Sequence, residues 1–100
     1  MRNSEKNGGV EKMNFEDVFS SKPRMKILKL LSRLGNLNVS DIARRIKLNY
    51  TTTNQHLKVL ENENILQQRD YGRIRMYRYQ DSPKANAIQK LIEIWNQESY

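Results

Sequence analysis

The stretch YTTTNQ, from Tyr50 to Gln55, presents six hydrogen-bonding side chains in a row and no acidic one. Thr and Asn each cost roughly a few tenths of a kcal/mol relative to Ala in a helix, so a helix that begins here needs another reason for them. Such side chains can bond to the edges of DNA bases, and a threonine methyl can contact thymine. The alternative is a solvated helix start capped by Asn49. We interpret the stretch as one that contacts bases.

The charge of the chain favours the same kind of partner. The 100 residues include 18 Lys and Arg against 11 Asp and Glu, which gives a net charge of +7. Such an excess indicates a polyanionic partner, with double-stranded DNA ahead of an acidic membrane surface. For each candidate phosphate contact, a solvated surface position is an equal alternative. These candidates are Lys22, Arg24, Arg44, Lys47 and Lys58.

Other classes of chemistry find little support. The chain has no Cys, one His and no Gly-rich loop long enough to cradle a phosphate. No nucleophile stands beside a base, so we predict that the protein is not an enzyme and uses no cofactor or metal. We expect packing or a phosphate contact for His56. There is no apolar run of about 18 residues and no apolar stretch in MRNSEKNGGV, so we expect no membrane association and a cytoplasmic location.

Hydrophobic spacing predicts where the helices lie. Residues 1–12 are polar and are expected to form a flexible tail, and residues 13–100 form one domain. Apolar residues three and four positions apart predict helices in NFEDVFSS, in SKPRMKILKLLSRLG, from about 50 to 63, and in SPKANAIQKLIEIWNQ. Asn14, Asn49 and Ser82 are the expected N-caps, and Gly35 the expected end of the second helix.

Two further segments complete the pattern. Leu37 and Val39 suit a short extended piece, after which Ser40 is expected to cap a two-turn helix. The alternation in ILQQRDYGRIRMYRY, with Asp70 and Gly72 in the middle, predicts a β-hairpin over about 66–79. The order of elements is that of a winged helix-turn-helix domain. The predicted fold class is α+β, mostly α, with a two-stranded β-wing and a C-terminal dimerisation helix.

From about Phe15 to Tyr79 the sequence resembles the ArsR-like family of transcriptional regulators. The resemblance is strongest in VSDIARRIKLNYTTTNQHLKVLENENIL and in YGRIRMYRY, and its most specific parts are Ala43 and HLKVLE. It implies that the tyrosines of the hairpin, rather than Ile74 and Met76, face the core.

The sequence departs from the family pattern in two places. Lys47 stands where the turn between the two helices usually has Gly, so Lys47 is expected at positive φ at a cost of about 1 kcal/mol if the turn is kept. Metal-sensing members carry Cys, His and Asp ligands on the first helix of the motif or on the last helix, whereas this chain has no Cys there and no His outside His56. This argues against metal sensing.

The leading hypothesis is a homodimeric, sequence-specific transcriptional regulator, most simply a repressor that occupies a promoter; the sequence does not indicate whether it has a small-molecule effector. An architectural DNA-binding protein and a winged-helix protein-interaction module are the alternatives. The helix at about 50–63 would enter the major groove, and the wing at 66–79 would approach the minor groove. The predicted DNA-binding residues are Tyr50, Thr51, Thr52, Asn54, Gln55, Lys58, Lys47, Arg44, Arg69, Tyr71, Arg73 and Arg75, and Thr53 is expected to face inward. The predicted dimer interface consists of Phe15, Phe19, Ile88, Leu91, Ile92 and Trp95, with a monomer as the alternative.

Overall fold

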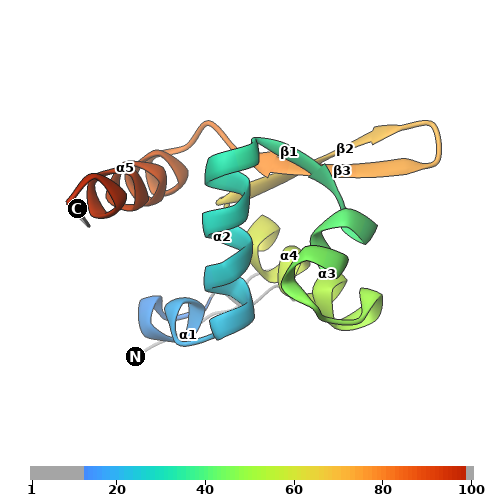
Figure 1. The fold of residues 1–100 in the computed structure, drawn as a ribbon, viewed down its shortest axis with the longest axis horizontal. Helices are drawn as coiled ribbons and strands as arrows, with labels where there is room; N and C mark the ends of the chain where they lie inside the picture. The colour runs from blue at the N-terminus through green and yellow to red at the C-terminus, as the bar shows by residue number, and fades with distance from the viewer. Residues whose placement is uncertain (1–12, 99–100) are drawn as a thin grey trace, which may run out of the picture.

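A computed structural model describes residues 13–98, so the expected tail at 1–12 lies outside the described residues. Figure 1 shows α2 at the centre, with α3 and α4 on one side, α5 on the other and the sheet along the upper edge. The helices are α1 (Phe15–Phe19), α2 (Lys22–Leu34), α3 (Val39–Ile46), α4 (Tyr50–Asn62) and α5 (Pro83–Gln97), and the strands are β1 (Asn36–Asn38), β2 (Leu66–Tyr71) and β3 (Ile74–Tyr79).

The predicted fold class is confirmed, but the sheet is larger than the predicted two-stranded wing. β3 pairs with β2 in the hairpin and, on its other edge, with the short strand β1, so the antiparallel order is β1-β3-β2. The pair Leu37↔Tyr77 lies in the β1–β3 ladder. The root of the wing is therefore held by the segment that joins α2 to α3.

Polar side chains cap α2, α4 and α5, and two of these caps, Asn49 and Ser82, are predicted ones. Ser21, Asn49 and Ser82 each accept a hydrogen bond from a backbone N–H in the first turn of the helix that follows. Asn14 occupies the N-cap position of α1, but its side chain makes no capping bond.

The prediction for the start of α3 is wrong by two residues. Val39 already belongs to the helix, and the cap is Asn38, whose Oδ1 accepts from the N–H of Asp41 at 2.7 Å. Ser40 is an exposed residue of the first turn. An Asn and a Ser two positions apart are both good caps, and the pairing of β1 with β3 as far as Asn38 decides between them.

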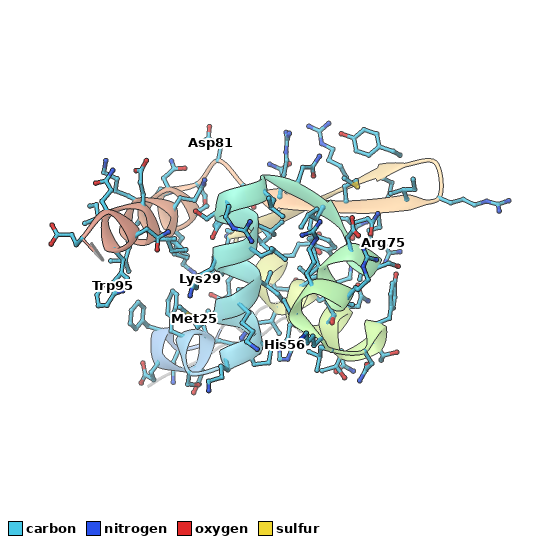
Figure 2. The ribbon with its side chains drawn as sticks, in the orientation of Figure 1. Met25, Lys29, His56, Arg75, Asp81 and Trp95 are labelled. Carbon is cyan, nitrogen blue, oxygen red and sulfur yellow. The ribbon has the colours of Figure 1, made fainter. Side chains whose placement is uncertain are left out.

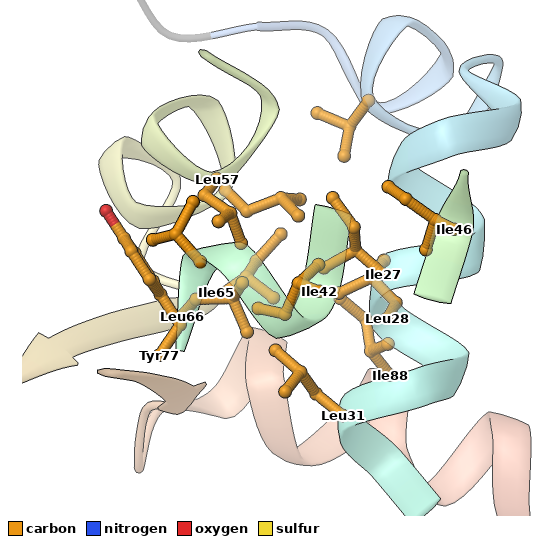
Figure 3. Packing of buried hydrophobic residues seen from close by; sticks show 13 residues of the cluster. Ile27, Leu28, Leu31, Ile42, Ile46, Leu57, Ile65, Leu66, Tyr77 and Ile88 are labelled. Atoms are coloured by element: carbon orange, nitrogen blue, oxygen red, sulfur yellow. The ribbon is translucent and has the colours of Figure 1, made fainter. Parts of the chain in front are cut away.

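The core is formed where α2, α3, α4 and the sheet meet (Figure 3). Each element contributes side chains with almost no exposed surface, at the spacings that the sequence predicts. Full burial of an aliphatic side chain of this size stabilises a fold by roughly 1.5–3 kcal/mol. The largest of these side chains are Ile27, Leu28, Leu31, Ile42, Leu57, Leu60, Leu66 and Tyr77.

A buried carboxylate joins both ends of the domain to α4. Glu63, the C-cap of α4, is only 3% exposed. Its Oε2 accepts from the backbone N–H of Met13 at 2.7 Å, and its Oε1 accepts from Nζ of Lys84 at 2.8 Å. A buried carboxylate needs such partners to offset its lost hydration. The segment before α1 and the first turn of α5 are thus both attached to the end of α4.

Candidate nucleic-acid interface

Helix α4 has one buried side and one exposed polar side. Thr53, Leu57 and Leu60 are fully buried, which confirms that Thr53 faces inward. Thr51, Gln55 and Lys58 recur every three or four residues and are exposed, and Thr52 is half-buried beside them. The first turn of this helix contains no acid. The exposed side therefore offers neutral and basic groups that do not repel phosphate.

The turn before α4 places the N-terminus of this helix at the protein surface. Lys47 adopts the left-handed conformation (φ 60°, ψ 51°), as expected from its position at the end of α3. Asn49 Oδ1 then accepts from the N–H of Thr52 at 2.8 Å. Tyr50 follows with its side chain 49% exposed. The two helices and this turn form the predicted helix-turn-helix, with the N-terminus of α4 accessible to a partner.

Asn54 differs from its neighbours on α4. The residue is half-buried, and its Oδ1 is shielded from solvent with no hydrogen-bond partner among residues 13–98. Most buried polar atoms have such a partner. Oδ1 of Asn54 therefore does not point to a ligand outside the protein, in contrast to the exposed side chain of Gln55.

The register of the hairpin assigns its side chains to two faces. Directly paired residues share a face, so Arg69 with Met76 and Tyr71 with Ile74 lie on one face. Arg75 lies on the other face with Tyr77, which is fully buried, so the inward tyrosine face is confirmed. Arg69 and Arg75, which are both predicted to bind DNA, thus lie on opposite faces of the wing. The third predicted arginine, Arg73, is exposed at the tip between the two strands.

A polar network joins the wing to α4. The hydroxyl of Tyr77 lies 3.2 Å from Glu61 Oε1 and 3.2 Å from Gln68 Oε1, and burial followed by the charge of Glu61 raises its pKa. Lys58 Nζ donates to Gln68 at 3.1 Å and lies 3.5 Å from Glu61. Lys58 therefore links the exposed side of α4 to strand β2 of the wing. Glu61 and Gln68 were not among the predicted site residues, because their roles depend on the strand register.

Arg24 is a correction to the predicted phosphate contacts. Its side chain is 9% exposed, and its guanidinium donates to the backbone carbonyls of Asp17 at 2.8 Å and Val18 at 3.3 Å. A third bond reaches Nδ1 of His56 at 3.0 Å. Arg24 thus holds the end of α1 against α2 and α4 and is not available to DNA. His56, for which packing or a phosphate contact is expected, thus makes a packing contact within the domain.

The contact between Arg24 and His56 determines which ring nitrogen of the histidine carries the proton. A guanidinium can only donate, so Nδ1 must accept and the neutral ring carries its proton on Nε2. Burial, followed by the positive charge of Arg24, lowers the pKa of His56 from its ordinary value of 6.5. The folded protein therefore resists protonation of this ring, whereas the unfolded chain does not.

We expect stability to fall as the pH drops below about 6.5, because the unfolded state then binds a proton that the folded state excludes. For one group the slope is at most about 1.4 kcal/mol per pH unit. His56→Gln keeps an acceptor for Arg24 but cannot titrate there, so it should lose this part of the pH dependence. Urea unfolding at pH 7.5, 6.5 and 5.5 measures both proteins. Identical pH profiles for the two proteins would contradict the assignment.

The predicted dimer residues divide into two groups. Ile88 is buried in the core of its own domain and is not free for a partner, so this part of the prediction is wrong. Phe19 and Ile92 pack partly against that core and keep part of their surface exposed. Phe15, Leu91 and Trp95 are 76%, 59% and 71% exposed. Figure 2 shows Trp95 projecting from α5 away from the sheet. The sequence analysis did not include Ile94, which is 43% exposed.

Two further classes of site are absent from residues 13–98. No helix in this range is long and apolar enough to cross a lipid bilayer. No group of three or more His, Asp or Glu side chains in this range is arranged to hold a metal ion.

Comparison with known proteins supports the interpretation of the fold. The chain matches the family model described as "Bacterial regulatory protein, arsR family" over residues 21–68, from the cap of α2 into β2. A comparison with curated protein sequences finds no significant match.

Several solved structures are similar to this chain. The transcriptional repressor PagR of Bacillus anthracis is 29% identical, with a TM-score of 0.64 over 76% of this chain and 85% of PagR. Reduced HlyU from Vibrio cholerae is 20% identical, with a TM-score of 0.70 over 83% and 82%. The homodimeric winged helix-turn-helix DNA-binding domain Mb0332 from Mycobacterium bovis is 24% identical, with a TM-score of 0.68 over 82% and 74%.

The family match covers the helix-turn-helix itself, and the three similar structures cover 76% to 83% of this chain. The departure at Lys47 leaves the turn geometry intact, since this residue adopts the left-handed conformation. The fold is therefore that of a winged helix-turn-helix protein, and its helix-turn-helix matches the model of the arsR family of bacterial regulatory proteins.

Proposed function

We propose that the protein is a homodimeric, sequence-specific regulator that binds double-stranded DNA in the cytoplasm and represses transcription by occupying a promoter. The observation that carries this proposal is the exposed side of α4, where Thr51, Gln55 and Lys58 are accessible beside a capped and acid-free helix start. A helix of this kind, with its N-terminus outward, suits the major groove. Arg73 at the tip of the wing suits the narrower minor groove beside it.

Exposed apolar side chains support the homodimer. Phe15, Leu91, Ile94 and Trp95 lie on the first and last helices and each exposes more than 40% of its surface. A contiguous apolar surface on a monomer commonly marks an interface, and two copies related by a two-fold axis would each contribute the same surface. The similar structure Mb0332 is described as homodimeric, and PagR is described as a transcriptional repressor.

An architectural DNA-binding protein with little sequence preference is the second candidate. The enclosed Oδ1 of Asn54 favours it, because one of the predicted base contacts is directed inward. The exposed Gln55, whose amide can bond adenine at two positions, favours sequence-specific binding instead. The two candidates thus differ in what Gln55 contributes to binding.

We expect Gln55→Ala to cost about 1–3 kcal/mol on a preferred site and little on DNA of unrelated sequence, because it removes bonds to base edges. Arg73→Ala should weaken binding to both duplexes by similar factors, because the backbone is alike in every sequence. The preferred site is first selected from a random DNA pool, and affinities are then measured at one salt concentration on the selected and a scrambled duplex.

Asn54→Ala tests the geometry of α4 in the same assay. Because Oδ1 of Asn54 is enclosed, this variant should affect binding to the selected site less than Gln55→Ala does. Equal losses on both duplexes for Gln55→Ala would favour the architectural candidate over the sequence-specific one.

A further inference from the structure

A second basic surface lies away from the exposed side of α4. It is a cleft of about 1110 Å³ between α2, the end of α3 and α5. Figure 2 shows Lys29 on the side of α2 that faces α5. Among the described lining residues the acid is Glu93, against six cations. These six, which we call the cleft cations, are Lys26, Lys29, Arg33, Arg45, Lys47 and Lys90.

Most of this charge is not neutralised within the domain. Lys90 lies 3.7 Å from Glu93. For the other five cleft cations the structure shows no ion pair with any carboxylate in residues 13–98. Unpaired cations this close together repel one another, so an anion bound between them would gain their combined attraction.

The spacing on α2 fits an extended anion rather than a compact one. Lys26, Lys29 and Arg33 are three and four residues apart and therefore share one side of the helix. They span about 10 Å at 1.5 Å per residue. One strand of duplex DNA carries a phosphate every 3.4 Å along the axis, so this span corresponds to about three phosphates.

The cleft cations are all exposed, and their long side chains are not held by buried polar partners. A site for a small anion needs a few groups fixed in place, whereas backbone binding needs only charge along a track. This difference favours a nucleic-acid backbone over a small anionic effector.

Helix α5 keeps the cleft separate from the exposed apolar surface. Ala85, Ile88 and Ile92 face the core along one stripe. By helical periodicity, Gln89 and Glu93 of the cleft lie on one flank of this stripe, and Leu91 with Ile94 lies on the other. A dimer formed through the apolar flank would therefore leave the cleft open.

The cleft also continues towards the recognition surface. Arg45 and Lys47 line the cleft and end α3, and two residues later Asn49 caps α4. Basic side chains thus follow one another from the start of α4 across the end of α3 to α2. The phosphate backbone of a duplex bound at α4 could therefore continue along the basic side chains at the end of α3 and on α2.

We propose that the cleft cations form a second nucleic-acid contact, which binds the phosphate backbone of the duplex outside the site at α4. This contact rests on the proposed DNA-binding function and extends it. It assigns Lys26, Lys29 and Arg33 a role in affinity and in the length of DNA covered, and none in base recognition.

The test compares two duplexes, one ending at the selected site and one extended on each side by about two helical turns. Wild-type protein should bind the extended duplex more tightly and with a steeper salt dependence. Lys29→Gln/Arg33→Gln should bind the short duplex like wild type. On the extended duplex its plot of log K against log salt should be shallower by about 1.8, or 0.9 for each lost phosphate contact.

The matched control is Lys29→Arg/Arg33→Lys, which keeps both charges and should keep the wild-type slope. An equal gain from the extension in wild type and in the Gln variant would overturn the proposal. The proposal would also be overturned if polyglutamate bound as tightly as the extended duplex and this binding were lost in the Gln variant. The cleft would then be a protein-docking surface. If the short duplex does not bind, the proposed function is contradicted but the proposed cleft contact is not. The cleft contact is still tested by comparing the Gln variant with its charge-keeping control on the extended duplex.

Discussion

Raising the salt concentration from 50 to 200 mM should weaken binding of the protein to its selected DNA site by about three to five orders of magnitude. This follows if roughly six to ten phosphates are neutralised, since each releases condensed counterions. The net charge of +7 on the chain is consistent with contacts to this number of phosphates. Lys22, Arg44, Lys47 and Arg73 are exposed in the described structure. Fluorescence anisotropy with a labelled duplex, repeated across this range of salt, measures the slope.

A control separates loss of binding from loss of folding. Circular dichroism at each salt concentration should show the same helix content, because surface ion pairs such as that between Lys90 and Glu93 contribute little to stability. An affinity that stays flat as salt rises would remove the proposal that the partner is nucleic acid.

The second large effect concerns assembly. Leu91→Glu/Ile94→Glu should convert the protein to a monomer, because two carboxylates would have to be buried in an apolar interface. Both side chains are exposed in the single chain, at 59% and 43%, so the fold itself should tolerate the change. Loss of the second half-site should reduce affinity for a full site by about 100-fold or more. Analytical ultracentrifugation and DNA titration measure the two results.

Asn96→Glu is the control for this change, since it adds a carboxylate at an exposed position of α5 on the polar flank. It should remain a dimer. Ile92→Glu would be a poorer choice, because Ile92 packs partly against its own core and could unfold the domain. A dimer of unchanged stability in the double variant would show that the copies meet elsewhere.

The positions of the helices followed from local rules, and for that reason they were predictable. Ser21, Asn49 and Ser82 cap their helices as their residue type requires. Thr53 was placed inward by its spacing from Leu57, and it is fully buried. Such features depend on neighbours within one turn.

Features that depend on residues distant in the sequence were less predictable. Arg24 was one of the basic residues predicted to contact phosphate, but α1 and His56 surround its guanidinium. Ile88 carried the same apolar signal as Leu91, and only the packing of α5 on α2 shows that Ile88 faces inward.

The face of the hairpin was also ambiguous by alternation, and the family resemblance rather than the residues identified the buried Tyr77. Three of the cleft cations, Lys26, Lys29 and Arg33, share one side of α2, and they were not among the predicted DNA-binding residues. Without α5 as the second wall, Lys29 and Arg33 resembled ordinary solvated residues.

Glu63 has a mechanical consequence. Its carboxylate attaches the backbone ahead of α1 and the first turn of α5 to the last residues of α4, so these three points move as one joint. A displacement of either terminal helix would therefore act on the inner end of α4, and through this helix on its outer end near Asn49. In a pair of such molecules, the distance between the two outer ends would depend on the angle at which the terminal helices meet.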